Sequence, residues 1–431
     1  MSSKGKLPAA ARGESALAPK LRFTEFREAD GWTLLPMGKV YSFGGNNSLS
    51  RDKLNYSSGS LRNIHYGDIH TKFSSHFDIT KELVPFVNEA ELGSIRESSF
   101  CSEGDLILAD ASEDLADIGK CIEITHLNNE KVVAGLHTIL AHPAKKQVAV
   151  GFGGHLFQSV SVRRQVQREA QGAKVLGISP RRLQDIRLPL PSFSEQQKIA
   201  DCLASADALI AAQDRKVEAL KAHKKGLMQQ LFPQEGETQP CLRFPEFEGM
   251  GEWSVKPLGK VAENLDNQRV PITSGDRVAG DVPYYGASGI VDYVEGYIFD
   301  EDLLCVSEDG ANLLARTYPI AFAISGKTWV NNHAHVLRFK HGFTQKLVEV
   351  YLNSIKLDEF ITGMAQPKLN KAKLDSIPMP LPKEPEQKRI ADCLSSLDNL
   401  IAAETRKLDT LKTHTKGLMQ QLFPQVGEDD A

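Results

Sequence analysis

The chain has 431 residues, of which 41% are hydrophobic and 25% charged, and its formal net charge at pH 7 is −4. This length allows two or three domains with cores of their own, and the composition is that of a soluble globular protein. The negative balance argues against indiscriminate binding to nucleic acid but leaves room for a local basic face. The longest apolar stretches, such as residues 318–325, are too short to span a bilayer.

The N-terminal segment, residues 1–20, is rich in Ala, Pro, Gly and Lys and lacks the apolar core of a signal peptide. Its composition predicts a disordered arm. The six cysteines contain no CxxC pair, so they indicate neither a zinc site nor a disulfide framework. A reducing, cytoplasmic location is the simplest interpretation.

An internal repeat organises the rest of the chain. Residues 195–234 and 386–425 align without a gap, and about 28 of the 40 positions are identical. A shorter repeat precedes each half, PKLRFTEF in the first and PCLRFPEF in the second, followed by Trp32 and Trp253 in register. Because internal repetition determines architecture, we expect two half-molecules in which equivalent segments hold two unlike ones.

Each long repeat predicts a helix. Apolar residues recur at alternating steps of four and three, which is the a/d seam of a coiled coil over about five heptads. Proline ends each copy because it cannot continue a helix. We expect helices at residues 195–233 and 386–424, each roughly 55 Å long at about 1.5 Å per residue. The apolar seam positions are Ile199, Leu203, Ala206, Ile210, Val217, Leu220, Leu227 and Leu231 in the first copy and Ile390, Leu394, Leu397, Ile401, Leu408, Leu411, Leu418 and Leu422 in the second.

Polar residues interrupt this seam at Gln213 and Lys224 in the first helix and at Glu404 and Thr415 in the second. In an antiparallel pair, one register places Lys224 opposite Glu404 and Gln213 opposite Thr415, so that the numbers of facing residues sum to 628. The alternative is that Lys224 and Glu404 lie at a loose edge and point to solvent. The pairing predicts that charge reversal at Lys224 weakens the packing and that Glu404→Lys restores it.

The segments before the helices, residues 21–194 and 242–385, contain short strand-like runs broken by Gly, Asn and Asp. A linker at 234–241 and an acidic tail at 425–431 complete the chain. The expected fold class is α+β, with two mixed α/β domains separated by two long antiparallel coiled-coil helices and a pseudo-two-fold internal repeat.

This layout resembles the DNA-specificity subunit of type I restriction–modification systems. The resemblance rests on EQQKIADCL and EQKRIADCL after the leads LPLPSFS and MPLPKEP, and on AQPKLNKAKLDSIPMPLP, PYYGASGIVDYVEGYIFD, DLLCVSEDGANL and the GLMQQLFP helix ends. No single motif is diagnostic, but their duplicated order is specific and covers the chain beyond residue 20. The resemblance implies a non-catalytic subunit whose two target-recognition domains each bind one half of a split double-stranded DNA sequence.

The resemblance also implies partners. The paired helices would set the spacing of the two domains and dock two methyltransferase subunits, and motor–nuclease subunits would join for restriction. The partners, and not this chain, would use S-adenosylmethionine, ATP and magnesium. A helix of roughly 55 Å matches about one and a half turns of B-DNA, and unlike domains would read unlike half-sites of an asymmetric target.

Candidate DNA contacts follow from the residue types that read bases and bind phosphates. Residues 163–187 form the strongest basic cluster, and residues 62–66 a polar–aromatic group, although a solvated face or a structural role explains either. The candidates in the first domain are Arg62, Asn63, His65, Tyr66, Arg163, Arg164, Arg168, Lys174, Arg181 and Arg182. Those in the second domain, where the aromatic residues equally suit a core, are Tyr284, Tyr285, Ser288, Lys327, Asn331, Asn332, His333, Gln366, Lys368, Asn370 and Lys371.

Motifs for other chemistry fail their context. Residues 325–328 look like the end of a P-loop, but Ala321 replaces the upstream glycine and a strand-like run follows where a helix is required. The run His333-Ala334-His335 lacks the HExxH spacing of a zinc site, so we expect no metal site there. The chain has no Asp/Asn-Pro-Pro-Tyr/Phe methylation motif and no GxGxxG loop. We therefore expect no catalysis by this chain alone.

A second class of function remains open, namely a scaffold whose coiled coil joins two protein-binding domains without DNA. Salt dependence separates the two classes. A DNA reader binds one bipartite duplex with an affinity that falls steeply as salt rises, whereas a protein adaptor shows no sequence-selective binding.

Overall fold

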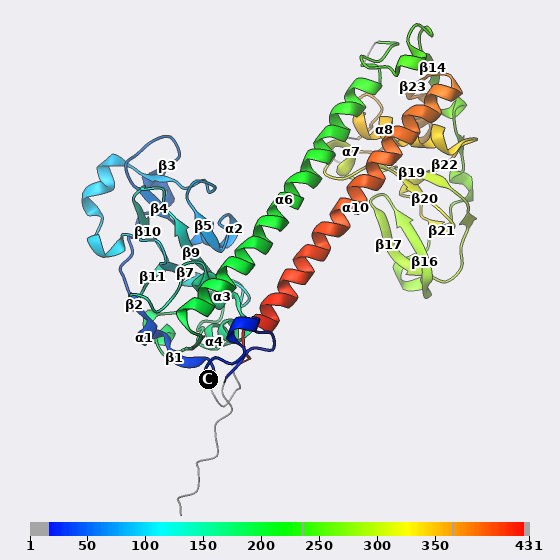
Figure 1. Ribbon diagram of the computed structural model, residues 1–431. Coiled ribbons are helices and arrows are strands. Elements are labelled where there is room, and N and C mark those ends of the chain that lie inside the picture. Colours follow the sequence, from blue (N-terminus) through cyan, green and yellow to red (C-terminus); the bar gives the residue numbers. More distant parts are fainter. Residues whose placement is uncertain (1–16, 235–236, 364–365, 426–431) are drawn as a thin grey trace, which may run out of the picture. The chain divides into compact units, whose positions relative to one another are not determined.

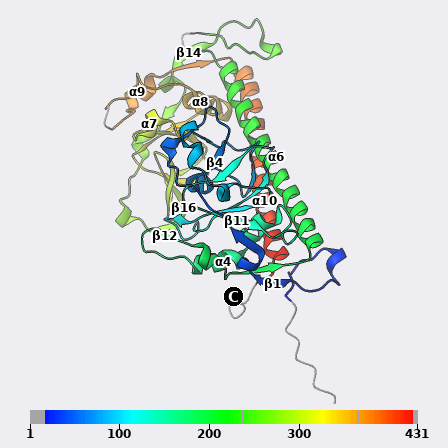
Figure 2. The same cartoon turned by 90° about the vertical axis from the view of Figure 1, so that its left-hand side faces the viewer.

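Two helices of 39 residues each run through the computed structural model, which describes residues 17–234, 237–363 and 366–425 (Figure 1). They are α6 (Phe193–Leu231) and α10 (Glu384–Leu422), and each begins and ends two residues before its predicted bounds. The ribbon of α6 is unbroken in two perpendicular views (Figure 1, Figure 2). Every predicted apolar seam position is buried or half-buried, so the heptad pattern is confirmed.

The predicted arm falls mostly on residues 1–16 and the predicted acidic tail on residues 426–431, which lie outside the described residues. Within the described ranges, no helix combines the length and the apolarity that crossing a membrane requires.

The chain divides into two compact units. Unit 1 joins the residues up to Ala212 to those from Leu408 onward, and unit 2 runs from Gln213 to Lys407. Each unit therefore contains part of α6 and part of α10. The predicted mixture of helices and sheets with two long helices is confirmed.

Unit 1 contains a mixed five-stranded sheet in the order β2-β11-β7-β9-β5 and a four-stranded sheet in the order β10-β4-β6-β3. In the larger sheet β5 pairs parallel with β9, and the other neighbours pair antiparallel. The larger sheet consists of β2 (Tyr41–Phe43), β5 (His76–Asp78), β7 (Leu106–Ala109), β9 (Cys121–His126) and β11 (Thr138–Pro143). The smaller consists of β3 (Leu54–Asn55), β4 (Arg62–Ile64), β6 (Phe86–Val87) and β10 (Val132–Ala134).

Short pairs and helices complete unit 1. The pair of β1 (Thr33–Pro36) with β13 (Arg187–Leu190) is antiparallel, as is that of β8 (Ala111–Ser112) with β12 (Leu176–Gly177). The helices are α1 (Met37–Val40), α2 (Tyr66–Thr71), α3 (Phe152–Gln158), α4 (Val160–Arg168) and α5 (Pro180–Leu183).

Unit 2 contains two four-stranded sheets, in the orders β15-β22-β19-β20 and β17-β16-β21-β18. The first consists of β15 (Glu263–Asn264), β19 (Leu303–Ser307), β20 (Ala321–Ile324) and β22 (Ala334–Arg338), and the second of β16 (Ala279–Gly286), β17 (Gly289–Val294), β18 (Phe299–Asp300) and β21 (Lys327–Val330). β14 (Ser254–Pro257) pairs with β23 (Pro378–Leu381). The helices are α7 (Asn312–Ala315), α8 (Gly342–Ser354) and α9 (Lys371–Ser376).

The two units share one sheet and differ in the other. The order β2-β11-β7-β9 of unit 1 matches the order β15-β22-β19-β20 of unit 2, with antiparallel neighbours and the same sequence order of strands in both. The second sheets have different orders and pairings. The unlike inserts are therefore built on a common sheet and diverge in what is added to it.

Equivalent contacts anchor the helices in each unit. Trp32 lies edge-on to Phe423, the residue after α10, with ring centroids 6.0 Å apart. Trp253 lies edge-on to Phe232, the residue after α6, with centroids 6.1 Å apart. All four side chains are buried. The two tryptophans, which occupy equivalent positions in the sequence repeat, thus pack in equivalent cores.

The helix pair is antiparallel, as expected, but its predicted register is wrong. Gln213 Nε2 donates to Glu404 Oε2 at 2.7 Å, Lys216 Nζ lies 2.6 Å from Glu404 Oε1, and Lys224 Nζ bonds to Asp398. The numbers of these paired residues sum to 617–622 instead of 628, so the register differs by about one heptad.

The physical reason for this error is the heptad itself. A shift of seven residues again places every a position opposite a d position, so the heptad spacing permits both registers. Polar groups outside the seam then contribute to the choice of register, because Lys216 bonds to the seam residue Glu404 and Asp398 bonds to the seam residue Lys224. Asp398 also accepts from Lys346 of α8 at 3.0 Å, which ties the helix to the sheet domain of unit 2.

Candidate nucleic-acid interface

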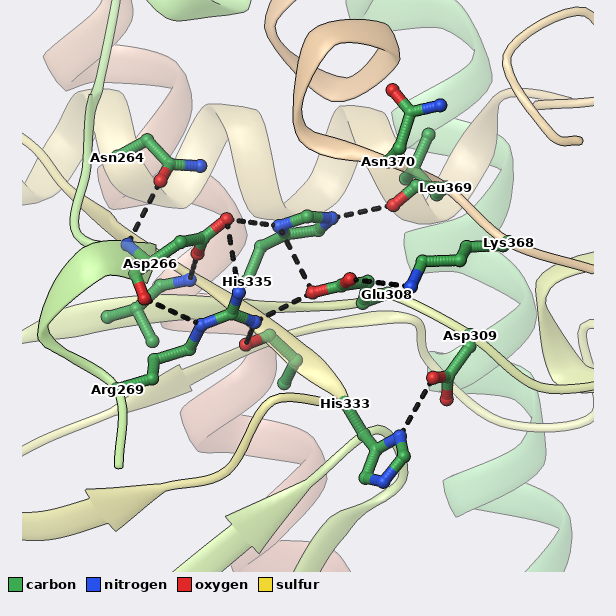
Figure 3. Close-up of polar contacts among 12 residues, drawn as sticks. Asn264, Asp266, Arg269, Glu308, Asp309, His333, His335, Lys368, Leu369 and Asn370 are labelled. Carbon is green, nitrogen blue, oxygen red and sulfur yellow. Dashed lines mark hydrogen bonds and ion pairs between the residues drawn. The ribbon is translucent and has the colours of Figure 1, made fainter. Parts of the chain in front are cut away.

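A buried ionic cluster lies beside β22 in unit 2 (Figure 3). The two histidines at positions 333 and 335 lie in different surroundings. His335, inside the strand, is 1% exposed at its side chain, whereas His333, in the turn before the strand, is 53% exposed and bonds to Asp309 at 2.7 Å. Of the two, only His335 therefore enters the cluster.

Both ring nitrogens of His335 face oxygen atoms. Nδ1 lies 2.6 Å from Asp266 Oδ2, and Nε2 lies 2.7 Å from the carbonyl oxygen of Leu369. A carbonyl only accepts, so Nε2 carries a proton. Burial alone would raise the pKa of Asp266, but the bonds from His335 and from the Val336 N–H lower that pKa below its ordinary value. The cluster therefore pairs the imidazole of His335 with the carboxylate of Asp266.

Further cations complete the cluster. Arg269 donates to Glu308 Oε2 and to the Ala334 carbonyl, at 2.7 Å each, and Lys368 Nζ lies 3.1 Å from Glu308 Oε1. Burial alone would raise the pKa of Glu308, but the Arg269 bond and the neighbouring His335 hold that pKa below its usual range. The two cations Arg269 and Lys368 thus both bind the carboxylate of Glu308.

This cluster positions the amide-rich loop before α9. The Leu369 N–H donates to the carbonyl of Glu308 at 2.8 Å, and Lys368 exchanges two backbone bonds with Thr362. Asn370 caps α9 by accepting from the Lys373 N–H at 3.0 Å. Of the predicted loop contacts, Lys368 and Asn370 are therefore partly committed to the fold. Gln366 and Lys371 have exposed side chains.

The β16–β17 hairpin places its predicted residues differently. Tyr284 is 1% exposed, and its hydroxyl lies 2.9 Å from the Ile272 N–H, so it belongs to the core. Tyr285 is half-buried and stacks on Phe322 with centroids 6.0 Å apart. Ser288 is exposed in the turn of the hairpin. Only the turn residue is therefore open to a ligand.

The strand β21 and the residues after it present a polar surface. Lys327 is exposed, with Nζ 4.7 Å above the ring centroid of Tyr297, and Asn332 is also exposed. Asn331 is buried and accepts from the His333 N–H at 2.8 Å, so it shapes the turn. The exposed candidates of unit 2 are Ser288, Lys327, Asn332, His333, Gln366, Lys368 and Lys371.

The polar–aromatic group of unit 1 is committed to the fold. Arg62 bonds to Glu130 at 2.6 Å and lies 3.9 Å above the ring of Phe86. Asn63 is fully buried, and it accepts from the Asn47 amide at 2.7 Å. His65 is buried and accepts from the Gly67 N–H at the start of α2, and Tyr66 packs on the His65 ring. The structural interpretation of this group therefore holds for its first three residues, while Tyr66 is half-buried.

The basic segment of unit 1 divides into bound and exposed residues. Arg163 donates to the carbonyls of Ala116, Ile118 and Gly119 at 2.8–3.1 Å and thereby holds a loop. Arg182 bonds to Glu169 at 2.9 Å. The exposed candidates are Arg164, Arg168, Lys174 and Arg181.

Sequence reasoning missed Asp266, Arg269 and Glu308. Asp266 and Arg269 contact each other three residues apart, but their contacts with Glu308 and β22 join residues 39 to 70 positions apart, so local spacing does not reveal the cluster. The rejection of the P-loop is confirmed, because residues 325–328 turn from β20 into β21 and no helix follows.

A family profile described as the type I restriction modification DNA specificity domain matches residues 250–413. A protein of Haemophilus influenzae described as a type I restriction enzyme specificity subunit is 41% identical over 149 residues, and the match covers 35% of this chain and 38% of that protein. The MjaX specificity subunit described from Methanocaldococcus jannaschii is 24% identical over 379 residues, which cover 82% of this chain and 85% of that protein.

Solved structures are similar in fold. The S subunit of a type I restriction–modification system from M. genitalium superposes with a TM-score of 0.58 at 13% identity, over 95% of this chain and 99% of that one. A chain from a structural study of complex assembly and conformational transition in the type I R-M system gives a TM-score of 0.56 at 15% identity, over 91% of this chain and 96% of that one.

Proposed function

Since the chain belongs to the family of type I restriction–modification specificity subunits, we propose that it reads an asymmetric, bipartite DNA target and directs partner subunits to it. The partners would be two methyltransferase subunits, which methylate adenine at N6, and motor–nuclease subunits, which cleave. S-adenosylmethionine, ATP and magnesium would serve those partners. The chain itself would act in the cytoplasm without catalysing a step.

The observation that carries the proposal is the pairing of a common sheet with a different second sheet in each unit. A duplicated anchor suits two domains that meet DNA in equivalent ways, because the DNA backbone is itself repetitive. Different second sheets suit different sequences, because base edges are read by side chains that reach into the grooves. An asymmetric target follows from this combination.

Exposed cations support the same proposal at the level of side chains. Lys327 and Lys371 of unit 2 and Arg164 and Arg181 of unit 1 are exposed, and such residues neutralise phosphates. A chain with a net charge of −4 then binds DNA through local faces and not through its overall charge.

The length of the helices supports a split target. A helix of 39 residues extends for about 58 Å at about 1.5 Å per residue. One turn of B-DNA occupies about 34–36 Å, so such a helix corresponds to more than one turn and less than two. We propose that α6 and α10 set the spacer between the half-sites.

The test is to map N6-methyladenine across host DNA with and without the gene, while the methyltransferase partner is expressed. Loss of one bipartite motif on deletion is the expected result. An unchanged methylation map would contradict the proposal and favour the protein adaptor. Binding measured at several salt concentrations gives a second readout, since a DNA reader loses affinity steeply as salt rises.

A further inference from the structure

Three side chains from distant parts of the chain meet in unit 1. His76 opens β5, His155 lies in α3, and Asp207 lies in α6. One potential ligand atom from each lies within 4.8 Å of the other two. The two imidazole rings have centroids 3.9 Å apart. The proposed reading of DNA assigns no role to this cluster.

Among the residues that the structure describes, none forms a hydrogen bond to either ring nitrogen of His155. Its side chain belongs to a residue that is 2% exposed, and both Nδ1 and Nε2 are buried without a hydrogen bond. Buried polar atoms have a hydrogen-bond partner in the large majority of cases. The two nitrogens of this imidazole therefore indicate a site for a ligand. A neutral imidazole has one nitrogen lone pair available to a metal ion.

His76 has the hydrogen bond that typically orients a metal ligand. Its Nε2 lies 2.9 Å from the carbonyl oxygen of Gly151. Because a carbonyl only accepts, Nε2 carries the proton, and Nδ1 holds the lone pair, 3.3 Å from the hydroxyl oxygen of Ser75. Metal-bound histidines commonly donate their second N–H to a carbonyl or carboxylate in this way. Asp207 adds an anionic oxygen from an exposed position on α6, which gives the cluster access to solvent.

We propose that His76, His155 and Asp207 bind a divalent transition-metal ion of the zinc class. Two neutral imidazoles and one carboxylate suit zinc and its first-row neighbours, whereas magnesium and calcium prefer sites made of oxygen alone. Three protein ligands leave one position for water. The ion would cross-link α6 to β5 and α3, and so fasten the larger sheet of unit 1 to its long helix.

The second cluster of this kind behaves differently. Asp266, Glu308 and His335 also bring three potential ligand atoms together. However, both nitrogens of His335 are bonded, and Arg269 and Lys368 already compensate the carboxylates. The unbonded nitrogens of His155 are what distinguish the site in unit 1.

The experiment uses the full chain without DNA, stripped with a chelator and titrated with Zn²⁺ by calorimetry. One ion per chain is expected, together with a zinc-dependent rise in Tm. Co²⁺ should give the visible absorption of a low-symmetry site with nitrogen and oxygen ligands. Asp207→Asn should lower the affinity about tenfold or more, since a charged ligand is lost. Asp214→Asn, an exposed carboxylate on the same helix, should leave the affinity unchanged.

Asp207→Asn is the decisive variant because its side chain is exposed and its loss leaves the core intact. His155→Ala should also abolish binding, and circular dichroism shows whether that variant folds. A wild-type chain that binds neither Zn²⁺ nor Co²⁺ at micromolar concentrations would overturn the proposal. Equal affinity and an equal zinc-dependent Tm in Asp207→Asn and Asp214→Asn would overturn it as well.

Discussion

Arg243 and Glu386 form a two-point ion pair, in which Nε and Nη2 each lie 2.7 Å from one carboxylate oxygen. Their side chains are 12% and 3% exposed. Arg22 makes the same contact to Glu195, at 2.8 and 2.7 Å. In each unit, an arginine that precedes the sheet domain thereby binds the first turn of the long helix that follows it, where an acidic residue also suits the helix dipole.

Breaking this pair should destabilise unit 2 strongly. Arg243→Ala leaves a buried carboxylate without its partner, which costs about 3–5 kcal/mol of unfolding free energy. Urea unfolding measures the loss. Arg389→Ala is the matched control, because its pair with Glu246 is about half exposed and should cost about 1 kcal/mol or less. Equal losses in the two variants would contradict a special role for the buried pair.

The observed helix register predicts which charges are coupled. In a double-mutant cycle, Lys224→Ala and Asp398→Ala should show a coupling of about 0.5–3 kcal/mol, because the two side chains bond. Lys224→Ala with Glu404→Ala should be additive within about 0.5 kcal/mol. Chemical denaturation of the four variants and the wild type provides the data. Coupling in the second cycle and none in the first would restore the register expected from the sequence.

Glu123 should make the stability of unit 1 depend on pH. Its buried carboxylate accepts from the Gly151 and Gly154 N–H groups at 2.7 and 2.6 Å, yet burial raises its pKa from 4.5 to about 7. A raised pKa in the folded state means that the stabilisation from this group is complete below the unfolded pKa and is lost as pH rises through about 7. Glu123→Gln stays neutral and should avoid this loss.

Between about pH 5 and about pH 8, the variant should therefore gain about 2–3 kcal/mol relative to the wild type. Urea unfolding at both pH values, in the presence of a chelator, measures the difference. Glu28→Gln, an exposed carboxylate, serves as control and should follow the wild type. Parallel pH profiles for Glu123→Gln and the wild type would contradict the prediction.

The exposed lysines of unit 2 should contribute to affinity for DNA without selecting sequence. In a complex with the proposed methyltransferase partner, Lys327→Ala or Lys371→Ala should weaken binding to matched and mismatched duplexes alike. Each should also reduce the slope of log affinity against log salt by about 1, because one phosphate contact is lost. Lys260→Ala, an exposed lysine outside the candidate surface, is the control. Unchanged slopes would exclude these two lysines from the interface.

Much of the scaffold could be predicted because its signals are local. Heptad spacing, the prolines that end the helices and the equivalent positions of Trp32 and Trp253 are all visible in short sequence segments. The structure confirms each of them. The candidate DNA contacts were harder to predict. Arg62, Arg163 and Tyr284 belong to residue types that bind DNA, but their side chains form hydrogen bonds inside the fold. Residue type alone does not reveal that commitment.

The sequence by itself determined that this protein has two long antiparallel helices, duplicated anchors and two unlike domains, since these follow from repetition and periodicity. Only the tertiary structure decided the helix register, because a shift of one heptad leaves the apolar pattern unchanged and flanking charges such as Asp398 select between the alternatives. It also decided which cations are free to meet a ligand. The tertiary structure also decided that His76, His155 and Asp207 lie together. The strand and helices that carry them are far apart in the chain, so no sequence spacing predicts this cluster.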